Sequence, residues 1–382
     1  MARLNPRGLA RLRDTLQSHI ARGHLPGAVA VVAQGGHVAA FEAMGRRDPA
    51  ADAAMAPDAI FRIYSMTKPI VSLAALMLAE EGRLQLGDPV AQYLPAFGRQ
   101  QVGVPEGDGL RMEPPRRPAT VHDLLRHTAG LTYEFLGTGA VNKRYAAVDI
   151  ADRSRTNAAF CEVLASLPLA DHPGTVWHYS RATDVLGALL EVVSGQPLGR
   201  LLQERILGPL GMRDTAFAVP QAEWARIAEP FATDPDSGAA VRMLEPREVP
   251  AFESGGGGLM GTAADYLAFL ECLRNGGLHQ GQRLVSRKTV EWMTADHLGG
   301  IPPVGELLLP GYGFGLGFAV RLQDGLGPQP GSAGQYFWSG IGGTSFFVDP
   351  REDLVGILMT QAPGQRIYYR NLFRALVYAA LD

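Results

Sequence analysis

Cysteine is scarce in this chain of 382 residues, which contains only Cys161 and Cys272. Both lie inside amphipathic helical patterns and form neither a disulfide framework nor a Cys-x-x-Cys motif, so we expect two buried thiols. No group of His, Cys, Asp and Glu has the spacing of metal ligands either. The sequence therefore predicts a reaction that needs no metal and no cofactor.

Long apolar runs and an excess of one charge are also missing. No run reaches the ~18 residues of a membrane span, and residues 1–7 lead into a charged segment without the apolar centre of a secretory signal. The 35 Lys and Arg nearly balance the 38 Asp and Glu, giving a net charge of -3. We expect a soluble, cytoplasmic protein with no nucleic-acid or membrane partner, and the oligomeric state stays open.

The length exceeds the usual size of one hydrophobic core, so two domains are expected. An amphipathic helix over 6–22 precedes two apolar strands, 28–33 and 38–44, which a Gly-Gly turn joins. Four β-type runs lie near the other end of the chain, before a final helix over 371–381. The runs are 312–322, 335–338, 344–349 and 354–361.

The middle of the chain is mostly helical in pattern. Residues 98–119 are rich in Gly, Pro and charge and predict an irregular loop, and Thr120 with Asp123 predicts a capped helix over 121–127. The whole order predicts an α+β fold of the α/β-sandwich type, with an antiparallel sheet built from both termini and flanked by helices. That domain comprises 1–72 and 250–382, and 73–249 forms an inserted, mostly helical domain.

A helix that is apolar on every side, residues 70–79, follows Ser65-Met66-Thr67-Lys68-Pro69. Such a helix belongs inside a protein, and Pro69 fits only near its start. Ser65 and Lys68 then share one face of the first turn. A serine becomes nucleophilic only when a base takes its proton, and a lysine serves as that base once burial or a neighbouring cation lowers its pKa.

Ser-x-x-Lys alone is weak, because a chain of this length contains on the order of one such match by chance. Two further stretches follow it in order, Trp177-His178-Tyr179-Ser180-Arg181 and Trp338-Ser339-Gly340. Together they resemble the serine β-lactamase and penicillin-binding protein superfamily, and within it the family VIII carboxylesterases, which are similar to class C β-lactamases. The resemblance extends to 121–131, 255–265 and 343–350 and covers most of the chain.

This resemblance implies a β-lactamase/transpeptidase-like fold and a role for each matching residue. Ser65 is then the nucleophile, and Lys68 and Tyr179 share the task of general base. The backbone N–H groups of Ser65 and Ile341 stabilise the oxyanion, and residues 338–340 form a strand that edges the pocket, so Trp338, Ser339 and Gly340 contact substrate. Whether Lys68 or Tyr179 holds the proton at rest stays open.

The sequence also departs from its lactam-hydrolysing relatives. They usually carry Lys-Thr-Gly where this chain has Trp338-Ser339-Gly340, and class C enzymes usually have asparagine at the position of Arg181. The Ser-Asp-Asn stretch of class A is absent. These differences count against β-lactam hydrolysis and agree with the esterase branch.

Other candidate residues surround these motifs. Tyr133 borders the active site by resemblance and is expected to contact substrate, with core packing as the alternative. Arg181 and His178, beside Tyr179, are also expected at the substrate, whereas His127 is expected to make a structural hydrogen bond. No serine lies in the Gly-x-Ser-x-Gly pattern of an α/β-hydrolase.

The resulting expectation is a serine hydrolase that cleaves a small-molecule ester of a short-chain carboxylic acid through an acyl-enzyme. In the same site, β-lactamase, D-amino-acid peptidase or acyltransferase activity remains an alternative. A non-catalytic penicillin-binding sensor or scaffold is the alternative from another class.

Overall fold

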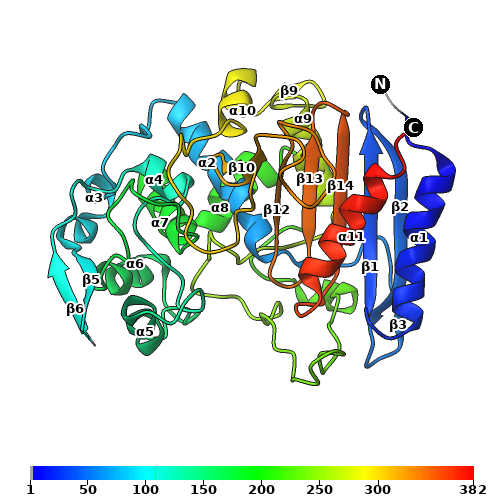
Figure 1. Cartoon of the computed structure of the whole chain (residues 1–382), viewed down its shortest axis with the longest axis horizontal. Coiled ribbons are helices and arrows are strands. Elements are labelled where there is room, and N and C mark those ends of the chain that lie inside the picture. The colour runs from blue at the N-terminus through cyan, green and yellow to red at the C-terminus, as the bar shows by residue number, and fades with distance from the viewer. Residues whose placement is uncertain (1–2, 108) are drawn as a thin grey trace.

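The computed structural model describes residues 3–107 and 109–382 and contains an eight-stranded antiparallel sheet (Figure 1). β1 lies beside β14, with Val31 opposite Ile357, so the two ends of the chain meet in one sheet as predicted. In sheet order, the strands are β10 (Tyr312–Phe314), β11 (Ala319–Arg321), β12 (Tyr336–Ser339), β13 (Ser345–Asp349), β14 (Leu354–Met359), β1 (Gly27–Gln34), β2 (His37–Asp48) and β3 (Ala53–Ala54).

Helices cover the centre of this sheet. α1 (Pro6–Ala21) and α11 (Arg366–Tyr378) pack side by side against β2 and β14 (Figure 1), while α9 (Ala263–Arg274) packs against β14 and β1. Every residue of β14 is buried, and a continuous apolar strand of this kind is typical of a sheet that is covered on both faces. The predicted sheet with flanking helices is therefore confirmed.

The apolar helix predicted behind Ser65 is α2 (Thr67–Glu80), in which every side chain from residue 67 to 78 is buried. It packs against α7 (Ala182–Ser194) of the helical region. Two contacts hold its first turn in place. The hydroxyl of Tyr266 donates to the Met66 carbonyl at 2.9 Å, and the Thr67 hydroxyl accepts from the Leu259 N–H at 3.1 Å. The start of α2 is thus rigid.

The remaining elements lie mainly in the middle of the chain. The Thr120–Asp123 capping box predicted from the sequence is present at the start of α4.

The division into two domains near residues 72 and 250 stays a prediction. The other helices are α3 (Val90–Tyr93), α4 (Val121–Leu125), α5 (Ala140–Ala147), α6 (Asn157–Ala165), α8 (Leu198–Leu202) and α10 (Arg287–Met293), with a π turn (Gln203–Leu207) and 3₁₀ turns (Tyr64–Met66, Pro95–Arg99, Gln221–Arg226). The short strand pairs are β4 (Phe61–Arg62) with β7 (Met260–Gly261), β5 (Val102–Glu106) with β6 (Gly109–Glu113), and β8 (Leu278–His279) with β9 (Gln282–Arg283).

Three expectations about local structure were wrong. The segment 98–119 is not an irregular loop, because β5 and β6 form a hairpin that the Gly103 N–H ties to the Leu169 carbonyl at 2.9 Å. The run 312–322 is two strands rather than one, since the chain turns at Gly317, whose φ of 108° suits glycine. The last helix begins at Arg366, five residues earlier than expected.

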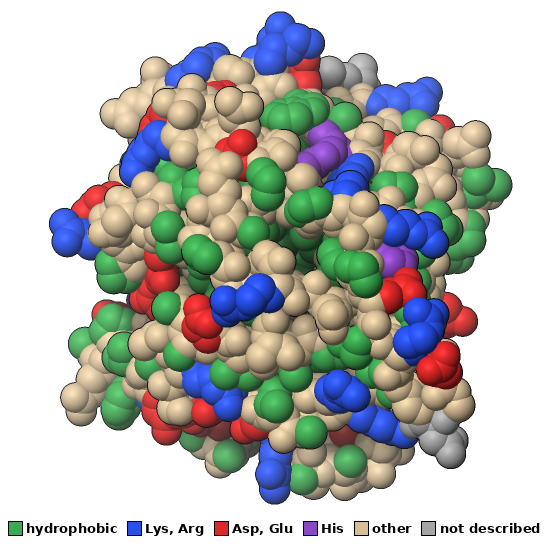
Figure 2. Space-filling view, turned by 90° about the vertical axis from the view of Figure 1, so that its left-hand side faces the viewer, with side chains coloured by type: hydrophobic (Ala, Val, Ile, Leu, Met, Phe, Trp, Pro, Cys, Tyr) green, Lys and Arg blue, Asp and Glu red, His purple; other side chains and the backbone are tan. Residues whose placement is uncertain are grey.

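Both cysteines are buried free thiols, as predicted. Among the described residues, no single helix is long and apolar enough to cross a membrane; residues 182–194 and 198–207 meet that test only as a pair bent by 77°. The same part of the chain holds no group of three or more His, Cys, Asp and Glu that could bind a metal ion. The face shown in Figure 2 carries interspersed acidic and basic side chains.

Candidate active site

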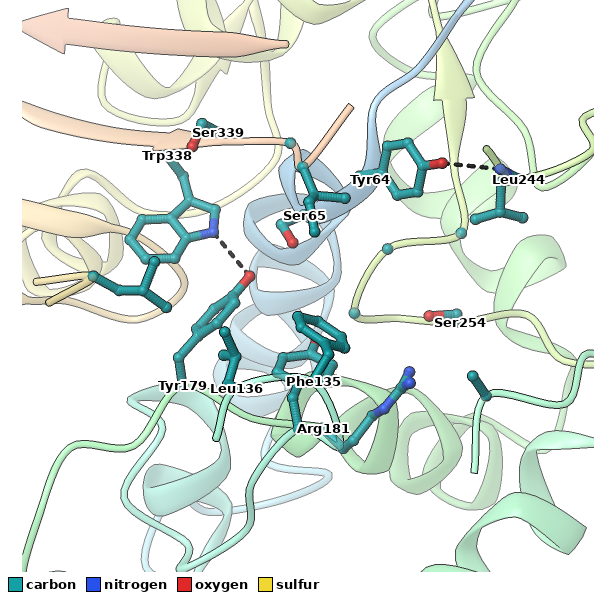
Figure 3. A pocket seen from close by; sticks show the side chains of 18 of the residues that line it. Tyr64, Ser65, Phe135, Leu136, Tyr179, Arg181, Leu244, Ser254, Trp338 and Ser339 are labelled. Atoms are coloured by element: carbon teal, nitrogen blue, oxygen red, sulfur yellow. Dashed lines mark hydrogen bonds between the residues drawn. The ribbon is translucent and has the colours of Figure 1, made fainter. Parts of the chain in front are cut away.

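A pocket of about 370 Å³ lies where the end of β12 meets the start of α2 and the segments before and after α7. Ser65 stands in its wall, in the 3₁₀ turn Tyr64–Met66 that leads into α2. Tyr64 has a φ of 45°, uncommon for a residue other than glycine, and its hydroxyl accepts from the Leu244 N–H at 2.9 Å (Figure 3). The surrounding structure thus holds the nucleophile candidate on a strained turn.

The Lys68 amine contacts three oxygen atoms. Nζ lies 3.2 Å from Ser65 Oγ, 3.0 Å from the Tyr133 hydroxyl and 2.6 Å from the Gly256 carbonyl oxygen. It also lies 4.6 Å from the centre of the Tyr179 ring. The three groups that the resemblance named, Ser65, Lys68 and Tyr179, therefore come together in space.

Burial changes the acid–base properties of Lys68. The side chain is completely buried, and the loss of hydration lowers its pKa from 10.5 to about 7. Asp184 opposes this shift, and Arg181 adds to it. A large fraction of the Lys68 amine is therefore uncharged at neutral pH.

Tyr179 is buried as well, and burial raises its pKa above the ordinary value of 10. The indole N–H of Trp338 donates to its hydroxyl at 3.2 Å, which partly offsets that effect (Figure 3). Figure 3 shows the Ser65 hydroxyl and the Tyr179 hydroxyl facing the same space, Ser65 from the turn before α2 and Tyr179 from the segment before α7. Tyr179 thus stays a neutral phenol at the pH at which Lys68 titrates.

Residues 338–341 border the pocket, but the strand that the resemblance implied for 338–340 ends at Ser339, so Gly340 lies just beyond β12. Glycine is required at 340, because a Cβ there would lie 2.5 Å from the Ile63 carbonyl oxygen. The Ser339 hydroxyl accepts from Nη1 of Arg370 at 2.8 Å. Among the described residues, the Ile341 N–H has no acceptor within the protein.

Tyr133 and Arg181 line the pocket too. The Arg181 guanidinium lies 4.8 Å from the centre of the Tyr133 ring and forms ion pairs with Glu134 and Asp184. Tyr133 contacts the Lys68 amine directly through its hydroxyl, and Arg181 lies against the ring of that tyrosine.

His178 is not brought to the pocket, which corrects its placement at the substrate. Its Nδ1 lies 2.8 Å from Asp171 Oδ2, and its Nε2 lies 3.0 Å from the Thr132 hydroxyl. Neighbours in an extended chain point to opposite sides, so a position next to Tyr179 does not bring the imidazole into the site. His127 is fully buried, with Nδ1 3.3 Å from the Ser180 hydroxyl, in keeping with the structural hydrogen bond expected for it.

Sequence reasoning missed several residues of the site, among them Gly256, Arg366 and Arg370. The glycines at 255–258 predicted only a turn, yet the Gly256 carbonyl holds the Lys68 amine. Arg366 and Arg370 line the pocket from α11, the C-terminal helix. No local pattern marks these arginines, because they look like solvated positions on an amphipathic helix.

An antiparallel sheet beside a helical region, with Ser65 and Tyr179 lining one pocket between them and Lys68 buried in contact with Ser65, defines a serine hydrolase of the β-lactamase fold. The Beta-lactamase family model matches residues 12–379. The chain therefore belongs to the Beta-lactamase family, and the resemblance to its class C-like esterase branch is confirmed.

Known proteins of several kinds are similar to this chain. Esterase EstB of Burkholderia gladioli is 37% identical over 373 residues, which cover 92% of this chain and 90% of that protein. The structure of EstCE1, a hydrolase with promiscuous acyltransferase activity, has a TM-score of 0.81 and 29% identity, with 97% and 98% of the two chains covered. Simvastatin synthase (LovD) of Aspergillus terreus, at 23% identity, a TM-score of 0.80 and coverage of 97% and 98%, shows the same fold.

Proposed function

We propose that this protein is a carboxylesterase that hydrolyses small-molecule esters of short-chain acids through an acyl-enzyme on Ser65. The contact of the Lys68 amine with the Ser65 hydroxyl at 3.2 Å carries the proposal. An uncharged amine has two N–H donors and one lone pair. The N–H groups can donate to the Gly256 carbonyl and the Tyr133 hydroxyl, which leaves the lone pair to accept the Ser65 proton.

The first half-reaction follows from this arrangement. Ser65 Oγ attacks the ester carbonyl carbon while its proton passes to Lys68 Nζ. Collapse of the tetrahedral intermediate breaks the bond to the alcohol oxygen, which takes a proton from the Tyr179 hydroxyl, and Lys68 restores the phenol. The Trp338 N–H already occupies an acceptor site of the Tyr179 oxygen, so the phenol O–H is left to donate into the pocket.

The second half-reaction releases the acid. A water molecule attacks the acyl carbon and gives its proton to Lys68, which passes that proton to the departing Ser65 Oγ. An ester and a water thus yield an acid and an alcohol, and the resting enzyme is restored. The backbone N–H groups of Ser65 and Ile341 would stabilise both tetrahedral oxyanions. Such donors are worth ~10²- to 10³-fold in rate each. The Ile341 N–H is suited to this role, because it has no acceptor in the part of the chain that the structure describes.

Two observations favour an ester over a β-lactam as the substrate. Trp338 places a neutral indole where lactam-hydrolysing relatives carry a lysine, so the cation that would hold a lactam carboxylate is missing at that position. In addition, EstB and EstCE1 are an esterase and a hydrolase by name.

A Ser65→Ala variant tests the proposal against p-nitrophenyl acetate and butyrate. We expect its kcat/KM to fall by ~10³-fold or more, with an unchanged unfolding temperature. Intact-mass measurement after rapid quenching should show an acyl adduct on the wild-type protein and none on the variant. A variant that hydrolyses both esters at the parent rate would refute the proposal.

Acyl transfer to an alcohol is the second candidate, because three large apolar side chains stand exposed at the pocket and could bind an organic acceptor. They are Phe135, Leu307 and Ile341. EstCE1, with its promiscuous acyltransferase activity, has the same fold. Product analysis with a competing alcohol separates transfer from hydrolysis, and a nitrocefin assay tests β-lactam turnover.

A further inference from the structure

Arg181 is a buried cation between two carboxylates. Its guanidinium binds Glu134 through two nitrogens, at 2.5 and 3.2 Å, and its Nη1 lies 3.4 Å from Asp184 Oδ2. Its side chain is only 9% exposed, and that of Asp184 is not exposed at all. Burial strengthens the interaction between such charges, because little water screens them.

Asp184 is connected to the catalytic amine through one residue. Its Oδ1 accepts from the Ser254 hydroxyl at 2.5 Å and from the Gly256 N–H at 2.9 Å. The carbonyl of the same Gly256 accepts from Lys68 Nζ at 2.6 Å. Without a compensating cation, the Asp184 carboxylate, one residue away from the amine in this chain of hydrogen bonds, would favour the ammonium form of Lys68. An ammonium cannot take the proton of Ser65.

We propose, building on the function proposed above, that Arg181 is a positioning residue: it compensates the charge of Asp184, so that the Lys68 amine stays uncharged beside Ser65. Two contacts give it this role. It forms an ion pair with Asp184 directly, and it lies against the ring of Tyr133, whose hydroxyl contacts the amine. Glu134 forms a second ion pair with the same guanidinium and fixes its position.

The other titratable groups that face Lys68 carry no charge near neutral pH. Burial raises the pKa of the Tyr133 and Tyr179 phenols and lowers the pKa of the His127 imidazole. Arg181, in the segment before α7, and Asp184, in α7, are therefore the charges that act on the amine, and Glu134 is held on Arg181. Changing either of the two should move the titration of Lys68 in a defined direction.

The test compares pH profiles of kcat/KM for p-nitrophenyl butyrate between about pH 5 and about pH 9.5, where the acid limb reports the free-enzyme base. Arg181→Met should move the midpoint of this limb upward by about one pH unit. Its kcat/KM should therefore be ~10-fold below that of wild type at neutral pH and should recover most of this loss at alkaline pH. Asp184→Asn should move the midpoint downward. The double variant should move back from the Arg181→Met midpoint towards that of wild type, because the Asp184 carboxylate is removed and only Glu134 stays without its partner.

Two results would overturn the inference. One is a loss of kcat/KM in Arg181→Met that is equal at all pH values, and the other is an upward shift of the acid-limb midpoint in Asp184→Asn. A rise in KM alone in Arg181→Met would instead make Arg181 a substrate anchor and would equally overturn it. If Arg181→Met does not fold, Arg181→Lys and Asp184→Asn test the inference instead. The lysine retains the positive charge, so Arg181→Lys should keep the acid-limb midpoint near that of wild type, while Asp184→Asn should lower it. An inactive Ser65→Ala beside unmoved midpoints would refute the role of Arg181 and leave the proposed esterase in place.

Discussion

The indole N–H of Trp338 donates a hydrogen bond of 3.2 Å to the hydroxyl of Tyr179, and the two rings lie 5.1 Å apart. Both side chains are buried. A lysine at position 338, as in Lys-Thr-Gly, would stabilise a phenolate by its charge, whereas a neutral donor supplies only one hydrogen bond. The indole therefore fits a Tyr179 that works as a protonated phenol, with Lys68 as the base.

Trp338→Phe removes this donor and retains most of the ring. We expect kcat/KM for p-nitrophenyl butyrate to fall by about tenfold, which corresponds to the ~1.4 kcal/mol of one hydrogen bond. Steady-state kinetics at a fixed pH would measure the fall. Phe337→Leu is a matched control, because it changes a neighbouring ring in the same pocket that donates no hydrogen bond. An equal loss in both variants would assign the effect to packing.

The pH dependence of the wild-type enzyme should follow Lys68. Its pKa of about 7 predicts that kcat/KM rises through neutral pH as the amine loses its proton. The raised pKa of Tyr179 keeps the phenol protonated, so the rate should then stay level to at least pH ~9.5. Initial rates with an ester of pH-independent stability would check this. A limb with its midpoint near pH 4 to 5 would point to a carboxylate as the base instead.

Much of the fold could be predicted because its strongest signals are local. The apolar runs at residues 28–33 and 354–359 are continuous and buried, as expected of strands that are covered on both faces. The capping box was predictable because Thr120 and Asp123, three residues apart, make all of its hydrogen bonds with each other. The hairpin β5–β6 was not predicted, because its apolar residues Val102 and Val104 stand among charged and turn-forming residues. What holds it is a contact with the distant Leu169, which no local pattern shows.

From local geometry alone, the site was predictable only where one motif brings its own groups together, whereas Tyr179, Tyr133 and Trp338 were placed there by the resemblance. Ser65 and Lys68 are three residues apart on one turn, so their contact follows from helix geometry. Tyr133 and Gly256 reach the same amine from 65 and 188 residues away, and no periodicity reports such a contact. The same holds for the Arg181–Asp184 pair, whose link to Lys68 passes through Gly256.

Asp123 should be a main contributor to stability in the helical region. Its side chain is completely buried and accepts from the Thr120 N–H at 3.0 Å and from the Thr128 hydroxyl at 2.7 Å, and it pairs with Arg117 and Arg126. Replacement by Asn leaves two arginines without a carboxylate, so we expect a loss of ~3 kcal/mol in the free energy of unfolding by urea. These contacts lower the pKa of Asp123, so its stabilisation is present at neutral pH and is lost as the pH falls below about 4. Asp152→Asn changes a partly exposed carboxylate that accepts from Ser154, and it should change the free energy of unfolding little; a loss equal to that of Asp123→Asn would contradict the assignment.

The buried Lys68 amine should cost the protein stability in return for its reactivity. Its pKa is about 7 in the folded protein and near 10.5 when exposed, so the unfolded chain binds a proton that the folded chain lacks between these values. Stability is therefore lost as the pH falls from about 10.5 to about 7, and the loss levels off below the folded pKa.

Lys68→Met removes this titration together with the catalytic base. We expect an inactive variant that is more stable than wild type by ~2–4 kcal/mol near neutral pH, with the gap narrowing towards pH ~10. Urea unfolding at several pH values would measure the gap. Lys143→Met, which replaces an exposed lysine on α5, should leave the pH dependence as it is. A Lys68→Met protein that is less stable than wild type throughout this range would mean that the bonds to Gly256 and Tyr133 outweigh the cost of burying the amine, and that Lys68 is held as a cation.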